Sequence, residues 1–107
     1  MPIDFVGDWC SPSQGEKNST WYTLPSWTED GHCTDILSID KFGFYFVTEK
    51  RHCVPVKMRL GTDTAPSGTS YTATVTARCQ PDGPVTAGKL QSFEFYRYKG
   101  SLSVTTK

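Results

Sequence analysis

The chain has 107 residues, and its eleven basic residues balance its eleven acidic ones, so the formal net charge is zero. A chain of this length builds one modest hydrophobic core, so we expect a single domain over residues 1–107. The scattered charges form no basic patch for nucleic acid, and no run approaches the ~20 apolar residues of a membrane-spanning helix. We therefore expect neither nucleic acid as a partner nor a membrane span.

The first predicted elements lie on either side of a loop that contains proline and glycine. The segment F-V-G-D-W-C at residues 5–10 begins the domain, and residues 11–19 are predicted to form the loop. The segment T-W-Y-T-L at residues 20–24 then predicts a strand, which ends at the proline that follows it.

Residues 35–60 predict three antiparallel strands that share one apolar face. Leu37 and Ile39 alternate with polar neighbours before a turn, and Phe44 and Phe46 follow that turn. We expect Ile39 to face Phe44 and Leu37 to face Phe46. A predicted loop at 48–52 is followed by four more residues that are expected inside, namely Val54 (opposite Phe46), Val56 (opposite Phe44), Met58 and Leu60. The agreement across two turns supports this register, because a slip of one residue would turn every side chain to the other face.

The remaining strands continue the alternation. Residues 61–68 predict a long hairpin loop, residues 71–78 a strand, residues 80–88 another loop, and Lys99-Gly100 a tight turn between the last two strands. The expected cross-strand pairs are Val56 with Val75, Met58 with Ala73, Arg97 with Leu102, and Phe95 with Val104. About eight short strands in this order remove their edges by closing on themselves. The predicted fold class is all-β, a single up-and-down antiparallel barrel.

Four cysteines, Cys10, Cys33, Cys53 and Cys79, favour two disulfides and an oxidising compartment, so we expect a periplasmic or extracellular protein whose leader has been removed. Their number leaves three pairings open. All four fall at one end of the expected barrel, and adjacency along the chain favours Cys10–Cys33 with Cys53–Cys79. The apolar alternation opposes the second pair, because it places Cys53 outside and Cys79 inside. A bulge near Pro55 would reconcile the two.

Two His-Cys pairs, His32-Cys33 and His52-Cys53, suggest a zinc site to be weighed against the disulfides. Structural zinc sites use closely spaced ligands, whereas no two cysteines here lie closer than twenty residues. Disulfide formation also removes the thiolate that a Cys/His nucleophile requires. The carboxylates fall mostly in predicted turns, where they cap backbone groups. We therefore expect no metal site, no cofactor and no enzymatic activity.

The aromatic side chains divide into two predicted groups. Those in phase with the interior are expected in the core, namely Trp9, Phe44, Phe46, Tyr71, Phe93 and Phe95. The others are out of phase or ambiguous, since adjacent residues on a strand such as Trp21 and Tyr22 point to opposite faces. Exposed aromatic residues are enriched at recognition surfaces. The candidate binding residues are Trp21, Tyr22, Trp27, Tyr45, Tyr96 and Tyr98.

The opening F-V-G-D-W resembles the Gly-x-Trp signature at the start of the first strand of lipocalins and other calycins. The resemblance implies a small barrel in which the tryptophan, here Trp9, is buried at the closed end under a cation, here Lys107 or Arg97. A longer pattern, F-V-G-D-W-C with a Cys before I-L-S-I-D, a Cys after F-Y-F-V-T-E-K-R-H and A-R-C before the last strands, resembles short secreted alpha-proteobacterial proteins of unknown function. It implies a fold and a periplasmic location but no chemistry.

Two functions are compatible with these expectations. The first is a secreted, non-enzymatic binding protein, an inhibitor for example, that holds a protein or a glycan with surface loops or exposed aromatic residues. The alternative is a lipocalin-like carrier of a small apolar ligand inside the barrel. An eight-stranded barrel is just wide enough for side chains or for one small ligand. Because large aromatic residues should fill it, we favour the first function and expect no interior cavity above ~300 Å³, the low end for ligand sites.

Overall fold

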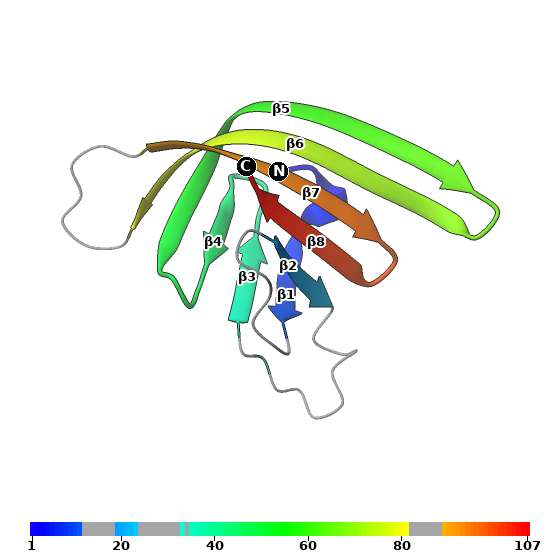
Figure 1. The fold of residues 1–107 in the computed structure, drawn as a ribbon, viewed down its shortest axis with the longest axis horizontal. Coiled ribbons are helices and arrows are strands. Elements are labelled where there is room, and N and C mark those ends of the chain that lie inside the picture. The colour runs from blue at the N-terminus through cyan, green and yellow to red at the C-terminus, as the bar shows by residue number, and fades with distance from the viewer. Residues whose placement is uncertain (12–18, 24–32, 34, 82–88) are drawn as a thin grey trace.

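A computed structural model describes residues 1–11, 19–23, 33, 35–81 and 89–107 (Figure 1). Within these residues lie one short 3-10 helix and eight strands, and no helix there is long and apolar enough to cross a membrane. The elements are η1 (Ile3–Phe5), β1 (Gly7–Ser11), β2 (Ser19–Thr23), β3 (Asp35–Ile39), β4 (Phe44–Phe46), β5 (Arg51–Ala65), β6 (Gly68–Pro81), β7 (Lys89–Tyr98) and β8 (Ser101–Thr106). The strands form a closed antiparallel barrel in the order β1-β2-β8-β7-β6-β5-β4-β3, which confirms the predicted fold class.

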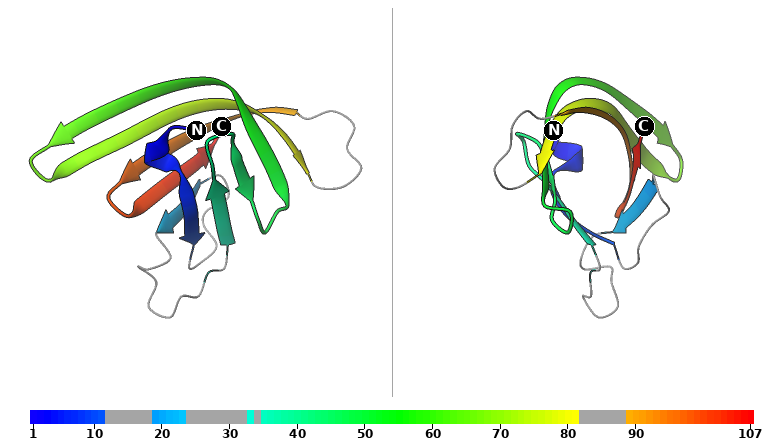
Figure 2. Two further views of the ribbon diagram at one scale, coloured as in Figure 1. Left: turned by 180° about the vertical axis from the view of Figure 1, so that it is seen from behind. Right: turned by 60° about the vertical axis from the view of Figure 1, so that its left-hand side comes forward.

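Neighbours along the chain are mostly neighbours in the barrel. From β3 to β8 each strand pairs with the next, and the barrel closes where β2 pairs with β8 and where β1 pairs with both β2 and β3. Figure 2 (right) looks into the ring of strands and shows η1 within its outline. The β5–β6 hairpin is the longest of the described hairpins and extends well beyond the rest of the barrel (Figure 1).

The register between β3 and β4 is the predicted one. Leu37 lies opposite Phe46, and Ile39 lies opposite Phe44. The turn between them is held by Asp40, whose backbone N–H donates to the carbonyl of Gly43 over 2.9 Å. One side-chain oxygen of Asp40 also accepts hydrogen bonds from the backbone N–H groups of Phe42 and Gly43, at 2.8 and 2.9 Å. This local bonding fixes the hairpin and therefore the face that each large side chain takes.

The register between β4 and β5 differs from the prediction. The connecting turn occupies residues 47–50 and is shorter than the expected loop, so Phe44 lies opposite Cys53 and not opposite Val56. Cys53 is consequently buried, whereas Val54 and Val56 point outward and are 55% and 56% exposed. The two valines were expected inside, and the prediction was wrong because the shorter turn reverses the face of the residues between it and the bulge after Pro55.

A bulge in β5 then changes the phase once more. The register shifts just after Pro55, where the bulge was expected, so Met58 pairs with Val75 and Leu60 with Ala73 instead of the predicted partners. Met58 and Leu60 therefore point to the same side as the buried residues of β6. They nevertheless remain 42% and 57% exposed, because in the described chain no strand continues the barrel beyond this part of β5.

The prediction of a long loop at residues 61–68 was also wrong. Both strands continue through this segment and meet at a two-residue turn, Pro66-Ser67. Gly68, with φ of 142°, follows the turn in a conformation that a side chain would strain. The polar Gly/Thr/Ser composition that indicated a loop instead belongs to a strand pair with solvent on both sides.

The core lies inside the barrel and is dominated by phenylalanine. Phe44 contacts Phe46, Phe93 and Phe95 edge to face, with ring centroids 5.1–5.7 Å apart. Edge-to-face pairs of this kind add about 0.5–1.5 kcal/mol each to the effect of burial. The other buried apolar residues include Phe5, Trp9, Tyr22, Leu37, Ile39, Ala73, Val75, Ala77, Leu102 and Val104, with Tyr71 partly buried against them. The predicted aromatic core is therefore confirmed.

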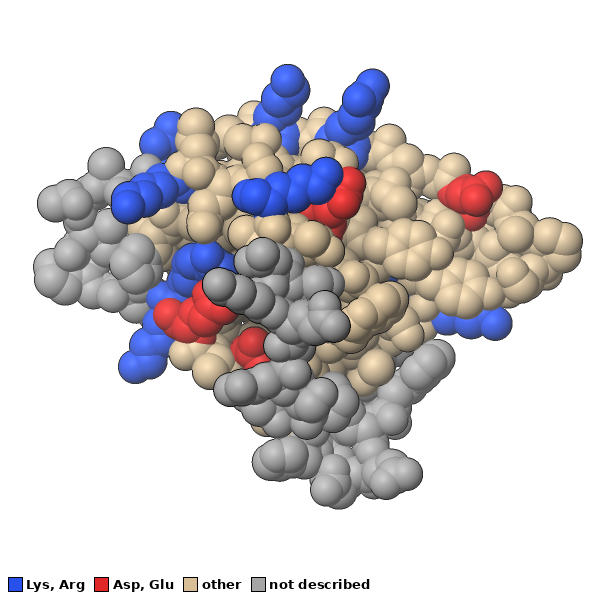
Figure 3. All heavy atoms as spheres, viewed as in Figure 1, with Lys and Arg blue, Asp and Glu red and all other residues tan. Residues whose placement is uncertain are grey.

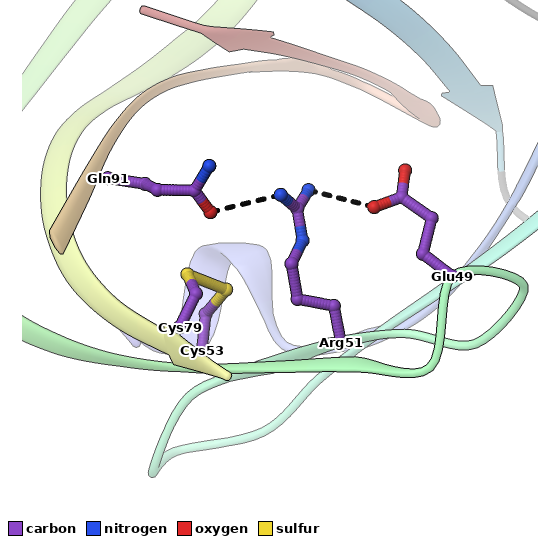
Figure 4. The surroundings of a disulfide bond; sticks show 5 residues. All are labelled: Glu49, Arg51, Cys53, Cys79 and Gln91. Atoms are coloured by element: carbon purple, nitrogen blue, oxygen red, sulfur yellow. Dashed lines mark hydrogen bonds and ion pairs between the residues drawn. A yellow bond between two sulfur atoms is a disulfide. The ribbon is translucent and has the colours of Figure 1, made fainter. Parts of the chain in front are cut away.

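Both disulfides have the predicted pairing, Cys10–Cys33 and Cys53–Cys79. The Cα atoms of Cys53 and Cys79 are 4.1 Å apart because the two residues are direct cross-strand partners. Beside this bond the Arg51 side chain extends between Gln91 and Glu49, donating one hydrogen bond and making one ion pair, both at 3.0 Å (Figure 4). Its guanidinium also lies over two core phenylalanine rings, at 4.6 and 5.7 Å from their centroids. A cation thus covers this end of the core.

Trp9 has the environment that the calycin resemblance implies. Its side chain is 1% exposed, and its indole N–H donates to the carbonyl of Phe5 over 3.0 Å. The Arg97 guanidinium lies 5.1 Å from the ring, and it also donates to the backbone carbonyls of Asp4 and Lys99. The expected burial of Trp9 beneath a cation is confirmed, with Arg97 as that cation. The 3-10 helix, the first strand and the seventh strand are joined through this one side chain.

Candidate functional site

Two of the candidate aromatic residues are brought together on the outside of the barrel. Ser103 in β8 pairs with Trp21 in β2 on one side and with Tyr96 in β7 on the other. Cross-strand partners share a face, so all three side chains point outward. Since neighbouring strands lie about 4.8 Å apart, the backbones that carry the two rings are about 10 Å apart. The residue between the two aromatic positions is the small Ser103.

We call Trp21, Ser103 and Tyr96 the aromatic face. Trp21 is 61% exposed and Tyr96 is 43% exposed, unlike the aromatic residues of the core. Single exposed apolar side chains are common on protein surfaces, so the informative feature is that two exposed aromatic residues flank the same position on one face. In Figure 3, which views the barrel from this side, the surface over the β7–β8 hairpin is mostly uncharged, and basic side chains gather over β5 and β6 above it.

Hydroxyl groups surround the two rings. The outward positions next to Ser103 in β8 are Ser101 and Thr105, and Tyr96 has Thr72 of β6 as its other cross-strand partner. These residues offer hydrogen-bond donors and acceptors without adding charge. Glu94, the cross-strand partner of Thr105, adds a charge at the border of the face, where it is paired with Lys107. The face therefore combines flat apolar rings with short hydroxyl side chains next to one ion pair.

Tyr98 lies on the same side as Tyr96 but has a structural role. Its hydroxyl donates to the carbonyl of Ser67 over 2.8 Å, and its ring lies over Gly68, where a Cβ would come within 3.3 Å of it. The ammonium of Lys99 lies 5.4 Å from the ring centroid. Tyr98 therefore holds the tip of the β5–β6 hairpin against β7.

The other candidate residues do not join the aromatic face. Tyr22 is 1% exposed and pairs with Leu102 inside the barrel, so its assignment to a surface site is wrong. Side chains alternate along β2, so Trp21 points outward and Tyr22 points inward. Trp27 lies outside the described residues.

Tyr45 is half-buried on β4, far around the barrel in strand order from β7 and β8. Its ring packs against His52, its cross-strand partner in β5, with centroids 4.9 Å apart. The two line a hollow of about 90 Å³ on the outer surface, together with residues of the β3–β4 turn. That volume is well below what a drug-sized ligand fills.

Another hollow, about 560 Å³ in volume, is an open depression along β5 and β6 bordered by Lys57, Met58 and Arg59. In the described part of the chain, no three His, Cys, Asp or Glu side chains gather closely enough to hold a metal ion.

The residues that separate and surround the aromatic pair were not predicted from the sequence. Ser103 was not singled out, although the alternation in S-L-S-V-T-T places the hydroxyl side chains of β8 on the face opposite Leu102 and Val104. That alternation could have identified them. Their position between the two rings could not be found in this way, because it depends on β8 lying between β2 and β7. No protein-family model, no curated protein and no solved structure matches the chain.

Proposed function

We propose that this protein is a secreted, calycin-like binding protein without enzymatic activity, which holds a macromolecular ligand, a glycan or a protein, on its aromatic face. The observation that carries the proposal is the exposure of Trp21 and Tyr96 on either side of Ser103. Aromatic rings of this kind dominate the energetics of recognition surfaces, because they bury much area while losing little side-chain entropy.

Three further observations support the proposal. The two disulfides favour the periplasmic or extracellular location, where such bonds persist. The Trp9–Arg97 contact supports the calycin-like assignment. The packed phenylalanine rings favour a surface site over the carrier function, because they occupy the interior where a carried ligand would bind.

The test compares the wild-type protein with the double variant Trp21→Ala/Tyr96→Ala on a solid support. Each protein is exposed to periplasmic extract and to a panel of soluble polysaccharides, and the retained material is measured by mass spectrometry and by affinity electrophoresis. If each ring contributes about 2 kcal/mol, its removal weakens binding about 30-fold, and the double variant should retain almost nothing.

The matched control is Phe42→Ala, which removes a 72% exposed aromatic ring from the β3–β4 turn. We expect this variant to retain the same material as the wild type. Equal retention by the double variant would overturn the proposal. Release of a small apolar molecule on denaturation of the wild type would instead support the carrier function.

A further inference from the structure

The longest strand of the barrel has an edge that the rest of the described chain leaves open. β5 pairs with β6 along its whole length but with β4 only from Arg51 to Cys53. No other described strand pairs with the edge from Val54 to Ala65, which runs along the top of Figure 1. Proteins usually protect such edges, because the unpaired N–H and C=O groups are a template for another strand.

Proline and the bulge block the backbone of this edge only at its beginning. Pro55 lacks an N–H group, and the bulge that follows it interrupts the register. From Lys57 to Ala65 the register with β6 is regular and no proline occurs. The open edge therefore extends over a segment about 30 Å long, at 3.3 Å per residue.

The hairpin turn determines which backbone N–H and C=O groups point toward the open edge. Ala65 and Gly68 flank a two-residue turn, so they form a hydrogen-bonded pair, and such pairs alternate with non-hydrogen-bonded ones along the ladder. The N–H and C=O groups of Met58, Leu60 and Thr62 consequently point away from β6, toward the open edge. A strand added here would bond to these residues.

The side chains of the edge are complementary to those of a second antiparallel copy. If a two-fold axis passes beside Leu60, the two Leu60 residues face each other, and Met58 faces the partner's Thr62. On the other face, Lys57 then lies opposite the partner's Asp63, and this pair occurs twice. A two-fold axis beside Gly61 would place Arg59 opposite the partner's Asp63 instead. Both registers join opposite charges across the strands, which is stabilising, and both use the outward-pointing backbone groups.

We propose that the occupant of this edge is β5 of a second copy of the chain, giving a two-fold symmetric dimer with one continuous sheet. The contact covers Met58 and Leu60, which are 42% and 57% exposed although they point to the same side as core residues of β6. A single pair of edge strands makes a small interface, so the dimer dissociates on dilution. A two-fold axis perpendicular to the sheet turns the outer faces of both copies to the same side. Where the proposed function holds, the two aromatic faces would bind a repetitive ligand together.

The test measures the molar mass of the oxidised, full-length protein by sedimentation equilibrium up to millimolar concentration. We expect a monomer–dimer equilibrium for the wild type. Asp63→Lys places like charges opposite each other and should raise the dissociation constant by up to about 30-fold, which corresponds to about 1 kcal/mol for each of the two pairs. Glu94→Lys, which makes the same change of charge on β7, is the matched control and should leave the dissociation constant unchanged.

Charge exchange then identifies the register. Lys57→Asp/Asp63→Lys restores the dimer if the axis lies beside Leu60, and Arg59→Asp/Asp63→Lys restores it if the axis lies beside Gly61. Leu60→Pro removes an N–H that points to the open edge without removing a bond to β6, and it should abolish the dimer. Far-UV circular dichroism checks that each variant is folded. A wild type that stays monomeric, or a dimer that persists in both Leu60→Pro and Asp63→Lys, would overturn the proposal.

Discussion

The contact between Trp9 and Arg97 predicts a measurable coupling at one end of the barrel. Trp9 is 1% exposed, and replacing a fully buried tryptophan by alanine costs about 3–5 kcal/mol. Arg97 lies 5.1 Å from the ring, in a geometry worth about 1 kcal/mol, and its hydrogen bonds to two backbone carbonyls add about 1 kcal/mol more. We therefore expect Arg97→Met to cost about 2 kcal/mol. Trp9→Ala alone should remove about 30–50% of the ~10 kcal/mol typical of a small domain.

The assay is urea unfolding of the oxidised protein, followed by far-UV circular dichroism so that the tryptophan changes do not affect the signal. The double variant should lose about 1 kcal/mol less than the sum of the single variants, because each single change already breaks the shared contact. Trp21→Ala is the matched control for Trp9→Ala. Its ring is 61% exposed, so the loss should stay within about 0.5 kcal/mol. Additive single losses, or equal losses for the two tryptophans, would refute the reasoning.

Three other predictions concern stability. Replacing both Cys53 and Cys79 by alanine should lower the free energy of unfolding by about 3 kcal/mol, measured by urea unfolding, and an unchanged value would show that the loop they close does not constrain the unfolded chain. Gly43→Ala should cost about 1–3 kcal/mol in the same assay, because the new Cβ would overlap a backbone carbonyl, whereas Gly61→Ala meets only a side chain and should cost less. Val54→Thr should change stability by less than about 0.5 kcal/mol, and a loss typical of a core valine would mean that this side chain is buried.

The barrel could be predicted from the sequence where local turns and alternation agree. The Asp40 turn sets the pairing of Leu37 with Phe46 and of Ile39 with Phe44, and all four large side chains lie inside. The turn and the alternation also agree in β7 and β8, because Lys99-Gly100 forms a tight turn and Phe95 pairs with Val104 as predicted. In both hairpins the information is contained within about a dozen neighbouring residues.

The same alternation misled the interpretation of β5. A turn shorter than expected placed Val54 outside, and the bulge beyond Pro55 then returned Met58 to the inner side. Apolar residues at every second position cannot reveal that β4 ends after three residues and leaves the rest of β5 uncovered. Burial here depends on the length of a neighbouring strand and not on the pattern of the strand itself.

The candidate site shows the same limit. Trp21 and Tyr22 are equivalent by sequence, and only the pairing of Tyr22 with Leu102 inside the barrel decides which of them is exposed. The meeting of Trp21 with Tyr96 depends on closure of the barrel through β8, which joins segments more than seventy residues apart. The exposed aromatic residues could therefore be proposed individually, but the aromatic face could not.

The measurement that tests the aromatic face most directly is the response of the tryptophan indole N–H signals to the retained ligand in two-dimensional NMR. The signal of Trp21, assigned with a Trp21→Phe variant, should shift or broaden on titration. The signal of Trp9 should remain in place, because its side chain is buried and its N–H is bonded to the carbonyl of Phe5. A shift of Trp9 without a shift of Trp21 would place the ligand at the interior and contradict the account.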